Sequence, residues 1–265
     1  MSFLQDITLG QYMPCDSFIH RLDPRVKFFI LLVLMISVFF IEAPIKFALM
    51  ALFVLLIITV SKISIKFVFK GIMPFIWLFL FAALAHFFFT PGHSIPPFPI
   101  GFVDVTREGV TGGIVITLRI FFIIVLSSML TLTTTPMELT TAVKKFLSPL
   151  ARFKVPVNDF AMMMMLTLRF IPILLLEAQR IINAQKSRGI DFETGGIFER
   201  ARKLVPILIP LFFLSFKRAD ELAVAMTCRG YRTGVDRSNF RELSFSSPDL
   251  LALVVAVIIV PFFFL

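Results

Sequence analysis

The chain contains 265 residues, of which 58% are hydrophobic and 16% are charged, and it carries a formal net charge of +9. A soluble domain of this length is usually about half apolar and about one quarter charged. The composition therefore excludes an ordinary soluble domain and predicts an integral membrane protein. The two cysteines, Cys15 and Cys228, form no Cys-x-x-Cys motif, which fits a reducing cytoplasmic side.

Five apolar stretches are candidate membrane spans. Acidic residues precede the first stretch, which argues against a cleaved signal peptide, so we expect that helix to be retained. A helical span needs about 20 apolar residues, and only the third and fourth stretches reach this length easily. The first two form a predicted hairpin, either tilted in a locally thin bilayer or partly re-entrant. The five stretches are residues 26–41, 45–60, 68–89, 109–133 and 250–265.

Two more apolar runs, residues 160–176 and 204–216, would give seven spans if both crossed the membrane. Such a hairpin would place a cluster of Lys and Arg outside, against the positive-inside rule. Arg169 would also lie within a span, where an arginine costs about 2.5–3.5 kcal/mol. We therefore interpret residues 135–247 as a cytoplasmic helical domain that lies against the membrane.

The five-span arrangement places 23 of the 26 Lys and Arg residues on the cytoplasmic side. It predicts a multi-pass protein of the cell membrane with a cytoplasmic N-terminus and a C-terminus outside. The positive charge lies on the cytoplasmic side of the apolar helices, as the positive-inside rule requires. We therefore expect a lipid bilayer as partner and no nucleic acid. The predicted domains are N-terminal membrane helices over 1–134, the cytoplasmic domain over 135–247 and a C-terminal membrane helix over 248–265. The proline-rich outer loop, 90–107, carries no motif.

The cytoplasmic domain is predicted to contain three helices. Thr135 and Glu138 flank Pro136 in a capping-box pattern that begins the first helix. The second begins near residue 158 and the third near residue 197, and a glycine just past each end supplies a cap. Three internal prolines should kink the two long helices, namely Pro172, Pro206 and Pro210. The predicted fold class is thus an all-α integral membrane protein with about five spans and a cytoplasmic three-helix domain.

Both long helices end in a small residue, an arginine and a glycine, with the two arginines 41 positions apart. Ordinary capping explains one such end, because arginine favours a helix C-terminus and glycine adopts the left-handed cap. Two matched ends favour paired docking, since a guanidinium binds a carboxylate with two hydrogen bonds. The candidate docking residues are Ser187, Arg188, Gly189, Cys228, Arg229 and Gly230.

The four consecutive methionines at 162–165 form an adaptable apolar surface. Simple lipid contact and a platform for helical partners explain this surface equally well.

Catalysis and metal binding have little support in the sequence. The three histidines share no helix face with one another or with a cysteine, and no phosphate-binding loop of the G-x-x-x-x-G-K-[ST] type is present. The spans also lack the row of carboxylates expected of an ion-coupled pump. Two alternatives remain open: a membrane-embedded enzyme that uses the outer loop with His86 or His93, and an autonomous secondary transporter.

Three segments resemble the transmembrane T component (EcfT, including CbiQ-like proteins) of energy-coupling factor transporters. Residues 17–27, Ser-Phe-Ile-His-Arg-Leu-Asp-Pro-Arg-Val-Lys, resemble the N-terminal signature of that family. Residues 168–189, ending Ala-Gln-Lys-Ser-Arg-Gly, and residues 218–231, ending Cys-Arg-Gly-Tyr, resemble its second and third coupling helices. The motifs occur in the expected order across nearly the whole chain. The family usually has alanine where Ser187 and Cys228 precede the arginines here.

The resemblance implies a non-catalytic coupling scaffold in a complex that takes up a vitamin or a metal ion such as cobalt. Two cytoplasmic ATPases, identical or homologous, would receive Arg188 and Arg229 and would bind the ATP and magnesium, with no cofactor in this chain. A substrate-binding membrane subunit, the S component, would contact the apolar faces of the coupling helices and topple when ATP-driven closure moves the helix ends. The candidate contact residues are Met162, Met163, Met165, Leu166, Phe212 and Phe213.

Overall fold

The computed structural model describes residues 12–91, 94–100, 103–153, 155–192, 194–232 and 247–264. The chain divides into two compact units, with a boundary between Ala142 and Val143. The C-terminal helix belongs to the same unit as the N-terminal helices. We call this the N-terminal unit, and the unit that contains the two long helices the helix-pair unit.

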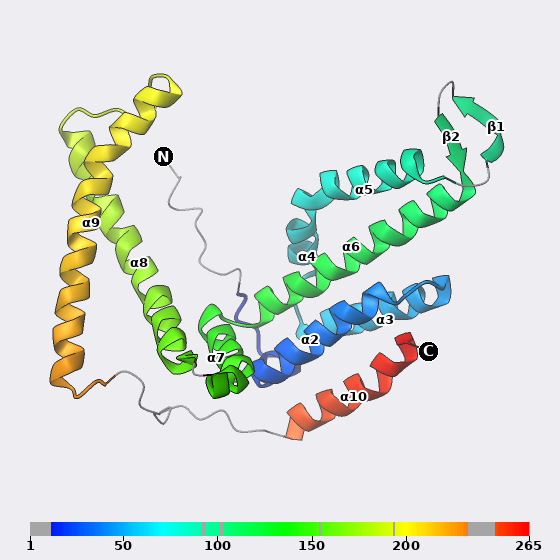
Figure 1. Ribbon diagram of the computed structural model, residues 1–265, viewed down its shortest axis with the longest axis horizontal. Coiled ribbons are helices and arrows are strands. Elements are labelled where there is room, and N and C mark those ends of the chain that lie inside the picture. The colour runs from blue at the N-terminus through cyan, green and yellow to red at the C-terminus, as the bar shows by residue number, and fades with distance from the viewer. Residues whose placement is uncertain are drawn as a thin grey trace. The chain divides into compact units, whose positions relative to one another are not determined.

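The predicted apolar stretches of the N-terminal unit all form helices, which confirms these elements (Figure 1). A short helix, α1, which the sequence did not predict, precedes them at Phe18–Arg21. Pro74 lies in a 3-10 turn, η1, between α4 and α5, because proline lacks the N–H that an α-helix needs there. The helices are α2 (Pro24–Phe39), α3 (Pro44–Ser61), α4 (Ile65–Ile72), α5 (Ile76–Phe89), α6 (Arg107–Thr133) and α10 (Ser247–Phe264), with η1 at Met73–Phe75.

The outer loop contains a small antiparallel sheet that the sequence did not predict, formed by β1 (Ser94–Ile100) and β2 (Val103–Thr106). The prolines of β1 conceal a strand signal, since proline cannot donate to a ladder. A two-stranded sheet consists of edges only, where proline is tolerated.

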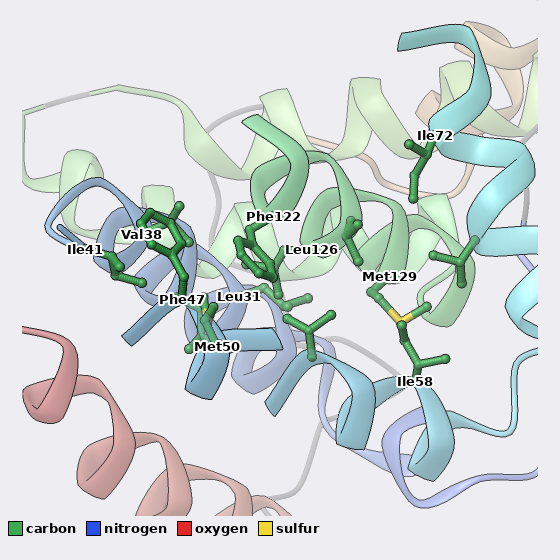
Figure 2. Close-up of a cluster of buried hydrophobic side chains, with 14 of the residues drawn as sticks. Leu31, Val38, Ile41, Phe47, Met50, Ile58, Ile72, Phe122, Leu126 and Met129 are labelled. Atoms are coloured by element: carbon green, nitrogen blue, oxygen red, sulfur yellow. The ribbon is translucent and has the colours of Figure 1, made fainter. Parts of the chain in front are cut away.

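The core of the N-terminal unit lies where α2, α3, α4 and α6 meet. Figure 2 shows Val38 and Phe47 near Phe122, with Leu126 and Met129 following along α6. The rings of Phe47 and Phe122 stack with centroids 6.3 Å apart. By contrast, α5 contributes no fully buried residue, and much of its apolar surface is exposed. Among the helices of the N-terminal unit, α6 packs against both α5 and α2, as Figure 1 also shows.

Three further helices follow, close to the predicted positions: α7 (Pro136–Leu147), α8 (Val157–Ser187) and α9 (Ile197–Cys228), with a 3-10 turn, η2, at Ser148–Phe153. The predicted capping box is confirmed. The Thr135 N–H donates to the Glu138 carboxylate at 3.0 Å, and the Glu138 N–H donates to Thr135 Oγ1 at 3.3 Å. Both long helices continue through their internal prolines. Figure 1 shows α9 changing direction part-way along its length.

Four helical segments in the described ranges are long and apolar enough to cross a membrane: Pro44–Ser61, Ile65–Phe89, Arg107–Thr133 and Val157–Ser187. The helices α2 and α10 are apolar but shorter, as the sequence indicated. The prediction of an all-α membrane protein is confirmed. The fourth segment is α8, which lies in the region predicted to be cytoplasmic. Length and composition do not by themselves place a helix in a membrane, so that assignment stays a prediction.

Candidate functional site

The C-terminus of α8 closes with a complete Schellman motif. Arg188 is the C-cap, and Gly189 follows it in the left-handed conformation with φ of +87°. The Gly189 N–H donates to the Lys186 carbonyl at 2.9 Å, and the Ile190 N–H donates to the Gln185 carbonyl at 3.1 Å. These two hydrogen bonds satisfy carbonyls that have no partner within the helix. The arginine is therefore held at a defined turn.

The C-terminus of α9 repeats this geometry. Gly230 has φ of +76°, its N–H donates to the Thr227 carbonyl at 2.9 Å, and the Tyr231 N–H donates to the Met226 carbonyl at 2.9 Å. The backbone angles of the two arginines nearly coincide, with φ and ψ of −86° and 6° at the first end and −85° and 9° at the second. The sequence repeat is thus also a structural repeat.

Both ends leave their arginine accessible. Arg188 and Arg229 are exposed, and among the described residues neither guanidinium forms an ion pair. A Cβ built on Gly189 or Gly230 meets no heavy atom within 4 Å. The glycines are therefore required by backbone conformation and not by crowding. The open space beside each arginine leaves room for the surface of a partner.

The two helices pack as an antiparallel pair, which places their Arg-Gly ends far apart. Gln185 near the end of α8 contacts Pro206 near the start of α9. At the other end of the pair, the Tyr231 hydroxyl donates to the Asp159 carboxylate at 3.3 Å. At about 1.5 Å per residue, these two contacts put the arginines roughly 40 Å apart. One small binding site cannot bind both arginines.

The Gln185 side chain replaces a backbone hydrogen bond that α9 lacks. The carbonyl of Pro206 would normally accept a hydrogen bond from the residue four positions later, but that residue is Pro210, which has no N–H. The Gln185 side chain donates to this carbonyl at 3.4 Å. The proline that weakens α9 thereby creates an acceptor for α8, one turn before the α8 docking end.

A groove of about 640 Å³ runs between α8 and α9 and is mostly apolar. Of the candidate contact residues, Met163 and Leu166 line this groove, whereas Met162, Met165, Phe212 and Phe213 do not. Phe212 and Phe213 are 61% and 74% exposed on the outside of the pair. The predicted contact residues thus fall on more than one face. Further residues line the groove that were not predicted, because they come together only when α8 packs against α9. They include Phe170, Leu174, Leu222 and Met226.

The N-terminal signature forms a buried polar clamp. Lys27 is 4% exposed, and its ammonium donates to the His20 carbonyl at 2.9 Å and to the Thr133 carbonyl at 3.2 Å. The Asp23 N–H donates to the Asp249 carboxylate at 2.7 Å, which ties α2 to α10. Lys27 lies within the signature at residues 17–27, but its role was not predictable from the sequence, and neither was that of Asp249. A single aspartate at the start of an apolar helix gave no signal.

His20 belongs to the same clamp. Its Nε2 lies 3.0 Å from the Met13 carbonyl, and its Nδ1 lies 2.7 Å from Ser17 Oγ. A carbonyl can only accept, so Nε2 carries the proton and Nδ1 accepts from the hydroxyl. Burial, followed by the positive charge of Lys27, lowers the pKa of His20 below its ordinary value of 6.5. The clamp therefore favours the neutral imidazole.

Of the two histidines in the enzyme alternative, the structure describes His86, which has no partner suited to catalysis among the described residues. His86 Nδ1 lies 3.2 Å from Thr90 Oγ1, and His93 lies outside the described residues. Within the described part of the chain, no group of three or more His, Cys, Asp or Glu side chains is placed to hold a metal ion.

The fold and the paired helix ends define a multi-pass helical membrane protein with surfaces for docking. The family model described as cobalt transport protein (CbiQ) matches residues 16–240. The energy-coupling factor transporter transmembrane protein EcfT of Clostridium kluyveri is 44% identical over 257 residues, covering 97% of this chain and 95% of that protein. The EcfT proteins of Streptococcus thermophilus and Bacillus subtilis are 44% identical over 252 residues, covering 95% of each chain, and 39% identical over 262 residues, covering 98% of each.

The chain therefore belongs to the CbiQ family, as a transmembrane component of energy-coupling factor transporters. It is a multi-pass membrane subunit of a transporter, as the resemblance implied.

Proposed function

We propose that this chain is the non-catalytic scaffold that couples two cytoplasmic ATPases to a substrate-binding S component. The observation that carries the proposal is the duplicated Schellman end with its exposed arginine at opposite ends of an antiparallel helix pair. Each guanidinium would bind carboxylates of one ATPase through two hydrogen bonds. A separation of roughly 40 Å suits two ATPase subunits better than one.

The rest of the assembly follows from this division of tasks. The ATPases would bind and hydrolyse ATP with magnesium, and this chain would need no cofactor. The groove between α8 and α9, with Met163 and Leu166 in its wall, would hold an apolar surface of the S component. Closure of the ATPases would move both helix ends, and the long helices would transmit this motion to the S component. The transported substrate would be a vitamin or a metal ion.

Docking of cytoplasmic ATPases requires both Arg-Gly ends to lie in the cytoplasm. We therefore propose that residues 135–247 are cytoplasmic, that the N-terminus is cytoplasmic and that the C-terminus lies outside. The distribution of Lys and Arg supports this orientation.

The test replaces Arg188 and Arg229 by alanine, singly and together, in the chain expressed with its ATPases and S component. Removing one partner of a buried charged contact costs about 2–5 kcal/mol. The double variant should reach the membrane normally but co-purify with little ATPase and support no ATP-driven uptake. The matched control replaces Arg169 and Lys217, two exposed basic residues on the same helices, and removes the same charge away from the C-caps.

Two results would count against the proposal. If the double arginine variant retains ATPase and uptake, the ends are ordinary helix caps. If the control that lacks Arg169 and Lys217 fails to the same extent, net positive charge on the helix pair matters and the two ends are not special. Substrate uptake by the purified chain alone, in liposomes without ATP, would instead favour an autonomous transporter.

A further inference from the structure

The helix pair exposes a phenylalanine almost completely at each of its two ends. Phe198, in the first turn of α9, is 93% exposed, and Phe153, the last residue of η2, is 82% exposed. Ile197 beside Phe198 is 87% exposed. Among the described segments, neither phenylalanine lies in one that is long and apolar enough to cross a membrane. Aromatic side chains are enriched at protein–protein interfaces, so both positions are candidate contacts for a partner.

Phe198 lies at the end of the helix pair that carries Arg188, as the yellow start of α9 in Figure 1 shows. The hydrogen bond from Gln185 to the Pro206 carbonyl aligns the two helices there. Arg188 is three residues beyond Gln185, about 5 Å along α8, and Phe198 is eight residues before Pro206, about 12 Å along α9. Packed helices are about 8–10 Å apart. Both side chains therefore fit within one interface of about 800 Å² per partner, which is roughly 30 Å across.

Hydrogen bonds hold the start of α9 in place. The Lys203 ammonium donates to the Thr194 carbonyl at 2.9 Å and forms an ion pair with Glu199 at 3.0 Å. The connection that leads to α9 also buries Phe192, which is only 7% exposed. The same segment thus buries one phenylalanine and presents the other, Phe198, to a partner.

The other end of the pair repeats this combination. The hydrogen bond between Tyr231 and Asp159 places Arg229 beside the start of α8. Phe153 is four residues before Val157, the first residue of α8, and four residues span at most about 14 Å. The turn η2 also packs against α8. Each exposed arginine is therefore accompanied by an exposed phenylalanine from the neighbouring element.

An exposed arginine is by itself a weak contact. A solvent-exposed ion pair strengthens binding by about five-fold at most, because water and salt screen it. Charged pairs contribute more when surrounding contacts exclude water from them. A phenylalanine that is buried by the same partner would exclude water in this way and would add its own apolar surface.

We propose that each docking end is a composite site, in which the arginine binds a carboxylate of an ATPase and the phenylalanine fills an apolar pocket beside that carboxylate. Phe198 acts with Arg188, and Phe153 acts with Arg229. This inference rests on the proposed coupling function and adds the chemistry of the partner surface. The arginine supplies orientation and salt dependence, and the phenylalanine supplies the apolar contact.

The test measures the affinity of the ATPases for the full chain, assembled with its S component in nanodiscs. Phe198→Ser should weaken binding about ten-fold to one-hundred-fold, the loss expected when a buried phenylalanine contact is removed. Phe198→Leu should retain most of the affinity. The matched control is Phe216→Ser, which removes a phenylalanine that is 68% exposed on α9 but away from both ends, and should leave the affinity unchanged.

Two further readouts separate the roles of the paired residues. Arg188→Ala should reduce the dependence of affinity on salt, whereas Phe198→Ser should lower affinity and leave that dependence unchanged. The two substitutions should also be non-additive, because residues that share one site depend on each other. Phe153→Ser should behave towards Arg229→Ala in the same way.

A fluorescent reporter decides whether the bilayer covers Phe198 instead. Trp77 is the one tryptophan of the chain, so Phe198→Trp combined with Trp77→Phe gives a single emitter at the α8 end. Its emission should shift to shorter wavelength when the ATPases bind, and brominated phosphatidylcholine in the nanodisc should not quench it.

The composite site is overturned if Phe198→Ser binds the ATPases as tightly as wild type while Arg188→Ala does not. It is also overturned if Phe216→Ser weakens binding equally, or if brominated lipid quenches the reporter and the ATPases do not shift its emission. If the arginine and phenylalanine variants all bind like wild type, the docking function itself is wrong.

Discussion

Replacing Gly189 or Gly230 by alanine should loosen one docking end and leave the rest of the helix intact. Both glycines have positive φ, +87° and +76°. For a residue with a Cβ, this left-handed conformation is about 1–2 kcal/mol less favourable than the right-handed one. No heavy atom lies within 4 Å of the added Cβ at either position, so backbone strain is the whole cost. The variant can relieve that strain only by unwinding the last turn, which breaks the two hydrogen bonds of the Schellman motif.

Amide hydrogen exchange measures this loosening directly. A penalty of about 1–2 kcal/mol corresponds to roughly 5- to 30-fold faster exchange, since about 1.4 kcal/mol is a factor of ten. The increase should be confined to the mutated end, at the N–H groups of Gly189 and Ile190 or of Gly230 and Tyr231. Because the arginine is then no longer fixed, retention of ATPase should fall even though the charge remains.

Two comparisons decide whether the reasoning holds. Gly230→Asn adds a larger side chain, but asparagine tolerates the left-handed conformation, so it should be milder than Gly230→Ala. Gly196→Ala places a Cβ in equally open space at a negative φ of −72° and should not show the local loosening. If Gly230→Ala exchanges like wild type, or if asparagine is as damaging as alanine, conformational strain is not what the glycine relieves.

The remaining predictions concern orientation, helix pairing and the N-terminal clamp. With Cys15 replaced by serine, a membrane-impermeant thiol reagent should label the exposed Cys228 in inside-out vesicles only, and labelling in right-side-out vesicles would contradict the proposed topology. Gln185→Ala should cost up to about 1–3 kcal/mol in thermal or denaturant unfolding of the helix pair, because the Pro206 carbonyl loses its donor, whereas Gln185→Glu should not substitute. Because the pKa of His20 is lower in the folded state than in the unfolded state, the neutral imidazole contributes to the free energy of unfolding. This contribution is fully present above pH 6.5 and is lost as the pH falls through the folded-state pKa. His20→Gln should therefore flatten the dependence of the thermal midpoint on pH between about pH 7.5 and about pH 5.5, and an unchanged slope would assign that dependence to other groups.

The local elements could be predicted well because their signals are local. A Thr-x-x-Glu pattern fixed the start of α7, and glycines that follow arginines fixed the ends of α8 and α9 within a residue. Capping requires only neighbours within one turn, so the chain around each end carries the necessary information. The β-hairpin of the outer loop was missed because its prolines conceal a strand signal.

The tertiary contacts were not predictable in the same way. Asp249 and Asp23 lie 226 positions apart, and nothing in the sequence links the start of the last helix to the start of α2. The same holds for Gln185 and the Pro206 carbonyl, since the missing donor is visible in the sequence but its replacement is not. Of the predicted contact residues, only Met163 and Leu166 line the groove, because helix periodicity identifies an apolar face without saying which neighbour covers it.

The sequence by itself determined that this is a helical membrane protein with two cationic, glycine-capped helix ends, because composition, charge and caps act over short range. Only the tertiary structure decided that α8 and α9 run antiparallel, that their arginines lie roughly 40 Å apart, and that five helices line an open apolar cavity beside Lys27. These features depend on side-chain packing between segments far apart in the chain, where many arrangements satisfy the same apolar pattern and only the complete fold selects one.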